Sequence, residues 1–235
     1  MNLAFGSKKK MLFYTFMLIC SVCFANDDLF RQARTLQRDG KYEDAIVAFK
    51  GYLSQPVLEY DLTNEKMVMY TDALVQLMNT FQSLGEPEAC VTTLREVFKA
   101  SPILQKNYLR DYYSVMGYAL SRTENMQEAE NMMLKAFTIP LHQPTPERYF
   151  RDYAYAAAVF YSNPKYQSEV IGWCQEALAQ AELCKNTSGS QWVMAMLGSL
   201  YKRNGRIDEA LELFLQSKEE AKMKNDDLGA FFIIC

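Results

Sequence analysis

The chain repeats one pattern about five times: a helix with a small residue inside it, a turn, and a second helix carrying an alanine and then an aromatic residue. Its clearest copy contains Leu197, Gly198, Tyr201, Gly205, Ala210 and Phe214. A helix pair of this kind is apolar on one face only, so pairs must stack to bury a continuous core. No segment shows sustained two-residue alternation. We therefore predict an all-α, right-handed superhelical solenoid of about five antiparallel helix pairs.

The boundaries of the pairs follow from small residues within helices and from residues that stop helices. The small-residue position recurs every 39 to 45 residues, at Ala33, Met78, Gly117, Ala158 and Gly198. Gly, Asn and Pro mark the turns, at Gly40, Gly85, Asn125, Asn163 and Gly205. The predicted pairs span about 27–54, 64–100, 102–139, 146–183 and 190–224, with a partial sixth at 226–235. Residues 140–146 and 185–190 are predicted loops, in which Thr145 or Ser190 caps the next helix.

Residues 1–25 have the pattern of an export signal. Lys8–Lys10 precede the uncharged apolar run Met11–Phe24, and Ala25 ends a cleavage-site pattern. As a helix the run is about 21 Å long, short of a hydrocarbon core of about 30 Å. We expect an exported repeat domain of residues 26–235 in the periplasm or cell envelope. An uncleaved N-terminal anchor and a lipoprotein are alternatives, although the residues before Cys20 and Cys23 fit a lipobox poorly.

Composition excludes several classes of function. The net charge is −3 and no basic stripe is present, which argues against nucleic-acid binding. Cys90, Cys174, Cys184 and Cys235 lack metal-ligand spacing, and Cys90 lies where a small buried residue is expected. His142 is the only histidine, and no catalytic or nucleotide-binding motif accompanies it. We therefore predict no catalytic residue, no metal site and no cofactor.

The repeated pattern resembles the tetratricopeptide repeat (TPR). The resemblance covers residues 27–235 and is strongest at Leu197, Gly198, Tyr201, Gly205, Ala210 and Phe214. The family standard is about 34 residues per repeat, so the longer intervals imply longer helices or loops and an irregular array. Exported arrays of this kind resemble the periplasmic sensor regions of bacterial membrane-bound signalling proteins, and also envelope assembly or scaffold proteins.

The last residues bear on that choice. Leu228-Gly229 repeats Leu197-Gly198 and opens the partial sixth repeat. We therefore expect the chain to be the N-terminal, sensory-input part of a longer signalling protein, which would reach a membrane only through a C-terminal part or an uncleaved N-terminal segment. A standalone envelope scaffold and a carbohydrate-binding helical-repeat protein remain alternatives.

The resemblance also implies where a ligand binds. In TPR proteins ligands usually lie on the concave face that the first helices form. Projecting the family's positions onto this chain gives the candidate ligand-binding residues Arg34, Asn79, Tyr118, Tyr155, Ser199 and Lys202. Tyrosines suit such a surface because each gives rigid apolar area with a hydrogen-bonding tip. We expect a protein or peptide ligand, and burial of both Tyr118 and Tyr155 would count against this groove.

Overall fold

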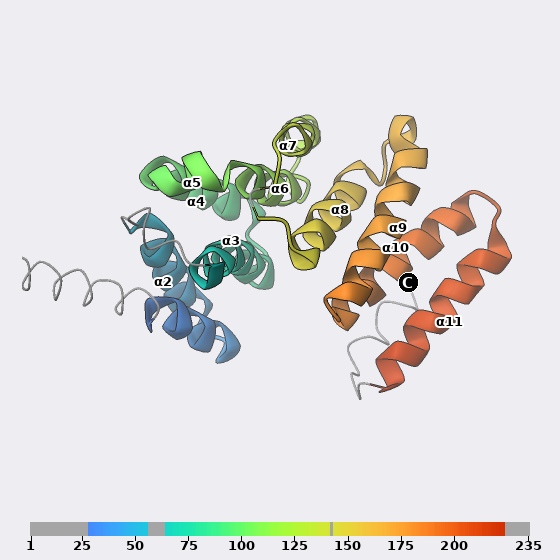
Figure 1. Cartoon of the computed structure of the whole chain (residues 1–235), viewed down its shortest axis with the longest axis horizontal. Helices are drawn as coiled ribbons and strands as arrows, with labels where there is room; N and C mark the ends of the chain where they lie inside the picture. The colour runs from blue at the N-terminus through green and yellow to red at the C-terminus, as the bar shows by residue number, and fades with distance from the viewer. Residues whose placement is uncertain (1–27, 56–63, 142, 224–235) are drawn as a thin grey trace, which may run out of the picture. The chain divides into compact units, whose positions relative to one another are not determined.

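The chain is built from helices wherever the structure describes it. The computed structural model describes residues 28–55, 64–141 and 143–223, and these ranges contain no strand (Figure 1). The predicted all-α class is therefore confirmed. The predictions for the export segment, His142, Cys235 and the partial sixth repeat fall outside the described residues.

The chain divides into two compact units, Met1–Tyr108 and Leu109–Cys235. In the first unit, helical residues 28–38 are followed by α2 (Tyr42–Ser54), α3 (Asn64–Leu84), α4 (Pro87–Ala100) and α5 (Pro102–Asn107). The second unit contains α6 (Leu109–Leu120), α7 (Met126–Thr138), α8 (Pro146–Phe160), the short 3-10 helix η2 (Pro164–Tyr166), α9 (Gln167–Leu183), α10 (Thr187–Arg203) and α11 (Ile207–Met223). Within it, α6 packs on α7, α8 on α9 and α10 on α11.

Three of the predicted turns rest on glycines in the left-handed backbone region. Gly40, Gly85 and Gly205 have φ angles of 76°, 73° and 73°. A residue with a Cβ atom adopts such angles only under strain, so glycine at these points ends the first helix and lets the second begin. The sequence therefore locates these three turns through backbone chemistry.

A ladder of aromatic rings forms much of the core of the first unit. The ring of Tyr52 lies 5.4 Å from that of Phe30 and 5.1 Å from that of Tyr70. Tyr70 in turn stacks on Tyr108, with ring centroids 5.7 Å apart. Because the rings come from residues 28–38, α2, α3 and the residue after α5, the ladder links three helices of the unit to its last residue. Burial raises the pKa of Tyr70 above its ordinary value.

The third repeat departs from the prediction of one continuous first helix starting at Pro102. The helix breaks at Tyr108, whose φ and ψ are −123° and 25°, and α6 starts only at Leu109. The buried Tyr108 ring stacks on Tyr70 at this break. Packing of one large side chain thus overrides helix continuity, and the division between the units falls at the same point.

The predicted loop at residues 185–190 is also wrong. The α10 helix begins at Thr187, and the side chain of Asn186 caps it by accepting a hydrogen bond from the Gly189 backbone N–H. Ser190 is therefore inside the helix and is not its cap. In the other connector Thr145 caps α8, as predicted, by accepting from the Arg148 backbone N–H.

The cysteines in the described residues are reduced. Cys90 and Cys174 are buried at 2% and 0% exposure, which confirms the prediction for Cys90, and Cys184 is half-buried. Burial raises the pKa of the Cys90 and Cys174 thiols to about 12. Both therefore stay protonated at neutral pH and act as small apolar side chains.

The packing of α10 on α11 predicts a contrast between two helical glycines. A Cβ atom at Gly198 would lie 2.7 Å from Phe214, whereas one at Gly172 meets nothing within 4 Å. We expect Gly198→Ala to lower the free energy of unfolding by about 1–3 kcal/mol through overpacking. Gly172→Ala should raise it by about 0.5–1 kcal/mol because alanine favours a helix. Urea denaturation measures both, and a Gly198→Ala variant as stable as wild type would contradict this packing.

Candidate functional site

Three aromatic side chains meet on the first helices of the second unit. Tyr118 of α6 stacks on Tyr155 of α8, with ring centroids 4.3 Å apart and planes at 6°. Trp192 of α10 packs edge-on against Tyr118 at 5.9 Å. We call these three residues the aromatic site. It joins all three first helices of this unit, which makes it the strongest candidate for a binding surface there.

The members of the aromatic site differ in exposure. Tyr155 is only 8% exposed, whereas Tyr118 and Trp192 are half-buried. Tyr155 therefore supports the surface from beneath, and the rings of Tyr118 and Trp192 present it to a ligand. Because Tyr118 is only half-buried, the two tyrosines are not both buried, which is the result that would have counted against the groove.

The other sequence-predicted residues fall into two groups. Ser199 and Lys202 lie one and two turns beyond Ala195 on α10, where Lys202 is exposed and the Ser199 hydroxyl donates to the Ala195 carbonyl at 2.8 Å. Arg34 and Asn79 belong to the first unit. Arg34 is exposed there, with a guanidinium nitrogen 3.8 Å from an Asp72 carboxylate oxygen, and Asn79 is half-buried. The structure brings Tyr118 and Tyr155 together but does not join them with Arg34 and Asn79.

Trp192 is the member that the sequence reasoning missed, although a signal was present. Tyr118, Tyr155 and Trp192 follow one another at equal intervals of 37 residues. The same 37 residues separate Asp111 from its partner Arg148. Alignment of the small helix residues gave steps of 40 and 41 for these repeats. Residues that touch across neighbouring first helices are thus 37 residues apart, whereas equivalent motif positions are 40 or 41 apart. The difference is about one helical turn, because neighbouring first helices are shifted along their axes by that amount.

Buried ion pairs join α6 to α8 two turns before the stacked tyrosines. Asp111 accepts from Arg148 Nε at 3.0 Å and also pairs with Arg148 Nη2 and with Arg151. Asp152 accepts from Arg110 Nε at 2.7 Å and from Arg151 Nη2 at 3.3 Å. Asp111 and Asp152 are 0% and 1% exposed. We call these five residues the ion-pair network.

The ion-pair network also holds the connector between α7 and α8. Arg110 donates to the Ile139 carbonyl at 2.8 Å, and Arg148 donates to the Gln143 carbonyl at 2.9 Å. Gln143 itself has a φ of 54°, an unusual angle for a residue with a side chain. The arginines therefore fix helix α8 and the chain that leads into it, which places Tyr155 against Tyr118.

The charges within the network decide its protonation. Burial raises the pKa of Asp111, but the positive charges and hydrogen bonds of Arg151 and Arg148 outweigh it and hold that pKa below its ordinary value. Burial opposes the charge of Arg151, yet Asp111 and Asp152 raise its pKa above the ordinary value. Asp111 is therefore a carboxylate at neutral pH and serves as a structural anion in an ion pair.

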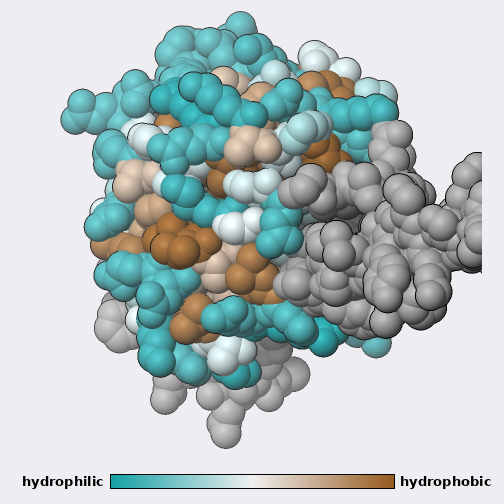
Figure 2. Space-filling view, turned by 90° about the vertical axis from the view of Figure 1, so that its left-hand side faces the viewer, coloured by the Kyte–Doolittle hydropathy of each residue, from teal (hydrophilic) through white to brown (hydrophobic). Residues whose placement is uncertain are grey.

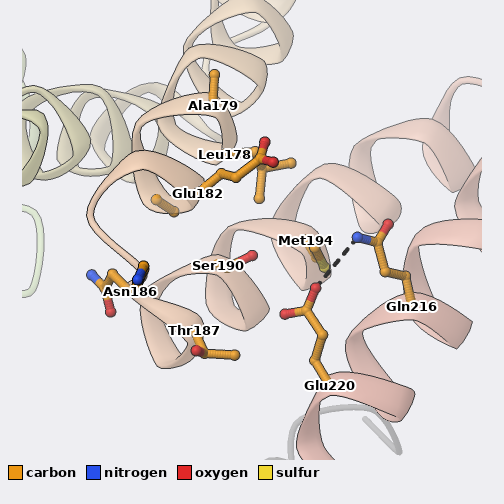
Figure 3. Close-up of a pocket in the computed structure, with 11 residues that line it drawn as sticks. Leu178, Ala179, Glu182, Asn186, Thr187, Ser190, Met194, Gln216 and Glu220 are labelled. Carbon is orange, nitrogen blue, oxygen red and sulfur yellow. Dashed lines mark hydrogen bonds between the residues drawn. The ribbon is translucent and has the colours of Figure 1, made fainter.

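A pocket of about 450 Å³ lies between the end of α9, the start of α10 and α11 (Figure 3). Leu178 and Met194 give it apolar wall, and Glu182 and Glu220 are among its polar side chains. Gln216 donates to Glu220 at 3.3 Å on the α11 side. In the first unit, a second pocket of about 420 Å³ includes the predicted residue Arg34. Neither pocket contains a side chain of the aromatic site.

The described residues give no sign of a metal site or a membrane span. In residues 28–55, 64–141 and 143–223, no three His, Cys, Asp or Glu side chains come together as metal ligands would. No helix in the same ranges combines the length and apolar character needed to cross a bilayer.

Exposed apolar side chains are dispersed over several helices. On the side of the molecule where Figure 1 draws α2 and α5, apolar side chains form small separate patches in a mostly hydrophilic surface (Figure 2). The most exposed large apolar residues of the described ranges include Val47, Val68, Leu183, Ile207, Leu211 and Leu215. The last three lie at four-residue spacing and thus form a single stripe along α11.

Comparison with known proteins agrees with this geometry. A tetratricopeptide-repeat family model matches residues 193–228, which include most of α10 and all of α11. A thermophilic TPR protein from Thermus thermophilus has a similar structure, with a TM-score of 0.57 and 18% identity over 89% of this chain and 100% of that chain. The described chain has a TPR-like fold.

Two further solved structures share the TPR-like fold. The TPR-like repeats of a kinesin light chain from Podosopora anserina give a TM-score of 0.53 at 18% identity, covering 85% of this chain and 96% of that chain. MamA from Desulfovibrio magneticus RS-1 gives 0.51 at 15% identity, covering 84% and 96%. No curated protein matches the sequence. At these identities the similarity establishes the helical-repeat fold and leaves the ligand to be inferred from the site.

The lowered pKa of Asp111 predicts a loss of stability in acid. A carboxyl group whose pKa is lowered on folding stabilises the fold above its unfolded pKa of about 4, and this stability is lost as the pH falls through the folded pKa. We expect the urea concentration at the unfolding midpoint to decrease as the pH is lowered below about 5. The decrease should be smaller in Asp111→Asn, whose midpoint at neutral pH is already lower than that of the wild type. Glu212→Gln, which replaces an exposed carboxylate of α11, is the control and should retain the wild-type pH profile. Identical profiles for wild type and Asp111→Asn would contradict this role.

Proposed function

We propose that this TPR-like chain binds a protein or peptide through the aromatic site. The observation that carries the proposal is the joining of three first helices by Tyr118, Tyr155 and Trp192, with two of the rings half-buried. Aromatic rings held in place by stacking lose little conformational entropy on binding and supply large contact area. They are typical of residues that contribute most of the energy of protein recognition.

The polar surroundings suit the same role. Lys202 is exposed and Ser199 half-buried on α10, the helix that carries Trp192. A polar edge beside aromatic anchors gives direction to the bound chain, as at other protein interfaces. The carboxylates of Asp111 on α6 and Asp152 on α8 are occupied by arginines of the ion-pair network, so the proposal includes no catalytic step.

We further propose that this binding takes place outside the cytoplasm, as the input step of a signalling protein. The support is in the sequence: the basic Lys8–Lys10 and the apolar Met11–Phe24 have the order of an export signal. An envelope scaffold would use the same surface for assembly. A carbohydrate-binding protein would stack sugar rings on Tyr118 and Trp192.

The binding proposal predicts that Trp192 dominates affinity. Peptides selected from a displayed random library on the wild-type chain should bind Trp192→Ala at least about tenfold more weakly, a loss of about 1.4 kcal/mol. Leu134→Ala, which alters an exposed apolar side chain on α7 of the same unit, is the control and should leave the dissociation constant unchanged. Equal binding by both variants, or glycan binding in place of peptide binding on an array, would overturn the proposal.

The export proposal predicts the N-terminus of the mature chain. When expressed in a bacterium and fractionated, the chain should be recovered from the periplasm with Asn26 as its first residue. Replacement of Lys8–Lys10 by glutamates should keep it in the cytoplasm, because the positive region is required for recognition. Recovery of the intact N-terminus in the membrane fraction would instead indicate an uncleaved anchor.

A further inference from the structure

The pocket between α9, α10 and α11 combines an apolar floor with charged walls. Its volume of about 450 Å³ lies within the range of protein pockets that hold small molecules. Three of its lining residues are apolar and well packed: Ala181 and Met194 are 2% and 4% exposed, and Leu178 is half-buried. These side chains offer a ligand an apolar surface on which methylene groups can be removed from water.

Two carboxylates enter this pocket from different helices. Figure 3 shows Glu182 extending from α9 and Glu220 from α11, with Ser190 and Met194 of α10 between them in this view. Glu220 accepts a hydrogen bond from Gln216 at 3.3 Å. Among the described residues, neither carboxylate forms an ion pair with a basic side chain. The negative charges at the pocket are therefore open to a ligand.

Both carboxylates occupy positions that helix electrostatics disfavour. Glu182 is in the last turn of α9, which contains no basic residue, and Glu220 is in the last turn of α11. The C-terminal end of a helix carries partial negative charge, so it stabilises a nearby cation and repels an anion. Lys185 is the one basic residue of the pocket lining, and with the two glutamates it gives the lining a net charge of −1. A ligand of this pocket should therefore be cationic.

We propose that this pocket binds a short aliphatic polyamine. One ammonium group pairs with Glu182 and a second with Glu220, while the methylene groups between them lie on Leu178 and Met194. The Ser190 hydroxyl supplies a further acceptor for an ammonium proton. A metal ion would leave the apolar floor uncovered, and a single lysine side chain would bring only one ammonium group. Two carboxylates on separate helices beside an apolar floor thus favour a diamine.

The polyamine site is separate from the peptide-binding surface proposed above. The pocket lining includes none of the three residues of the aromatic site. Failure of peptide binding would therefore leave this inference standing, and the reverse also holds.

Calorimetric titration with a series of diamines tests the proposal. The series runs from 1,3-diaminopropane to 1,8-diaminooctane in about 0.15 M salt, where exposed charges are screened. One diamine should bind at least about tenfold more tightly than the monoamine of equal length. Glu182→Gln and Glu220→Gln should each weaken its binding about tenfold. Glu212→Gln, an exposed position of α11 outside the pocket, is the matched control and should bind as the wild type does.

Four results of this titration would overturn the proposal. They are no diamine binding, equal binding of diamine and monoamine, unchanged affinity in both pocket variants, and binding of a lysine-containing peptide or of Mg²⁺ in place of the diamine.

Melting temperatures separate a ligand site from a structural role of the same carboxylates. Thr187, the first residue of α10, also lines the pocket, and the N-terminal end of a helix stabilises nearby anions. If the carboxylates served only α10, Glu182→Gln and Glu220→Gln would melt below the wild type without ligand, which would contradict the proposal. We expect both variants to melt at or above the wild-type temperature. Addition of the diamine should then raise the melting temperature of the wild type and of Glu212→Gln alone.

Discussion

The buried pairing of Asp111 with Arg148 and Arg151 is the interaction on which the second unit depends. Charged groups lose hydration when they leave water, and the loss is offset only if every charge meets a partner at close range. Here two aspartates face three arginines, and the arginines also donate to the Ile139 and Gln143 carbonyls. Each ion pair has a short reach and a defined direction, so the pairs favour the one register of α6 against α8 in which all of them form.

That register produces the aromatic site. Asp111 and Arg148 are separated by 37 residues, and so are Tyr118 and Tyr155 two turns further along. The helices that the ion pairs align therefore also bring the two rings face to face, and Trp192 of α10 packs edge-on against Tyr118. The binding surface that we propose follows from a structural ion-pair network lying away from the ligand.

Local backbone chemistry explains which parts of the fold the sequence predicts. Gly40, Gly85 and Gly205 mark turns because only glycine tolerates their φ angles, and Cys90 is buried because its register demands a small residue. The sequence does not reveal the ion-pair network, since aspartates and arginines at helical spacing ordinarily face solvent. Trp192 and the break at Tyr108 are missed because both depend on contacts between side chains from different helices.

Amide hydrogen exchange of Asp111→Asn tests the central claim most directly, because it reports the stability of each helix separately. Loss of the carboxylate leaves Arg148 and Arg151 buried without their shared anion. If the ion-pair network holds α6 to α8, exchange should become faster in these two helices and in the connector at residues 139–145, while α2 and α4 of the first unit keep their wild-type rates. Unchanged exchange in α6 and α8, or an equal increase in all helices, would contradict the account.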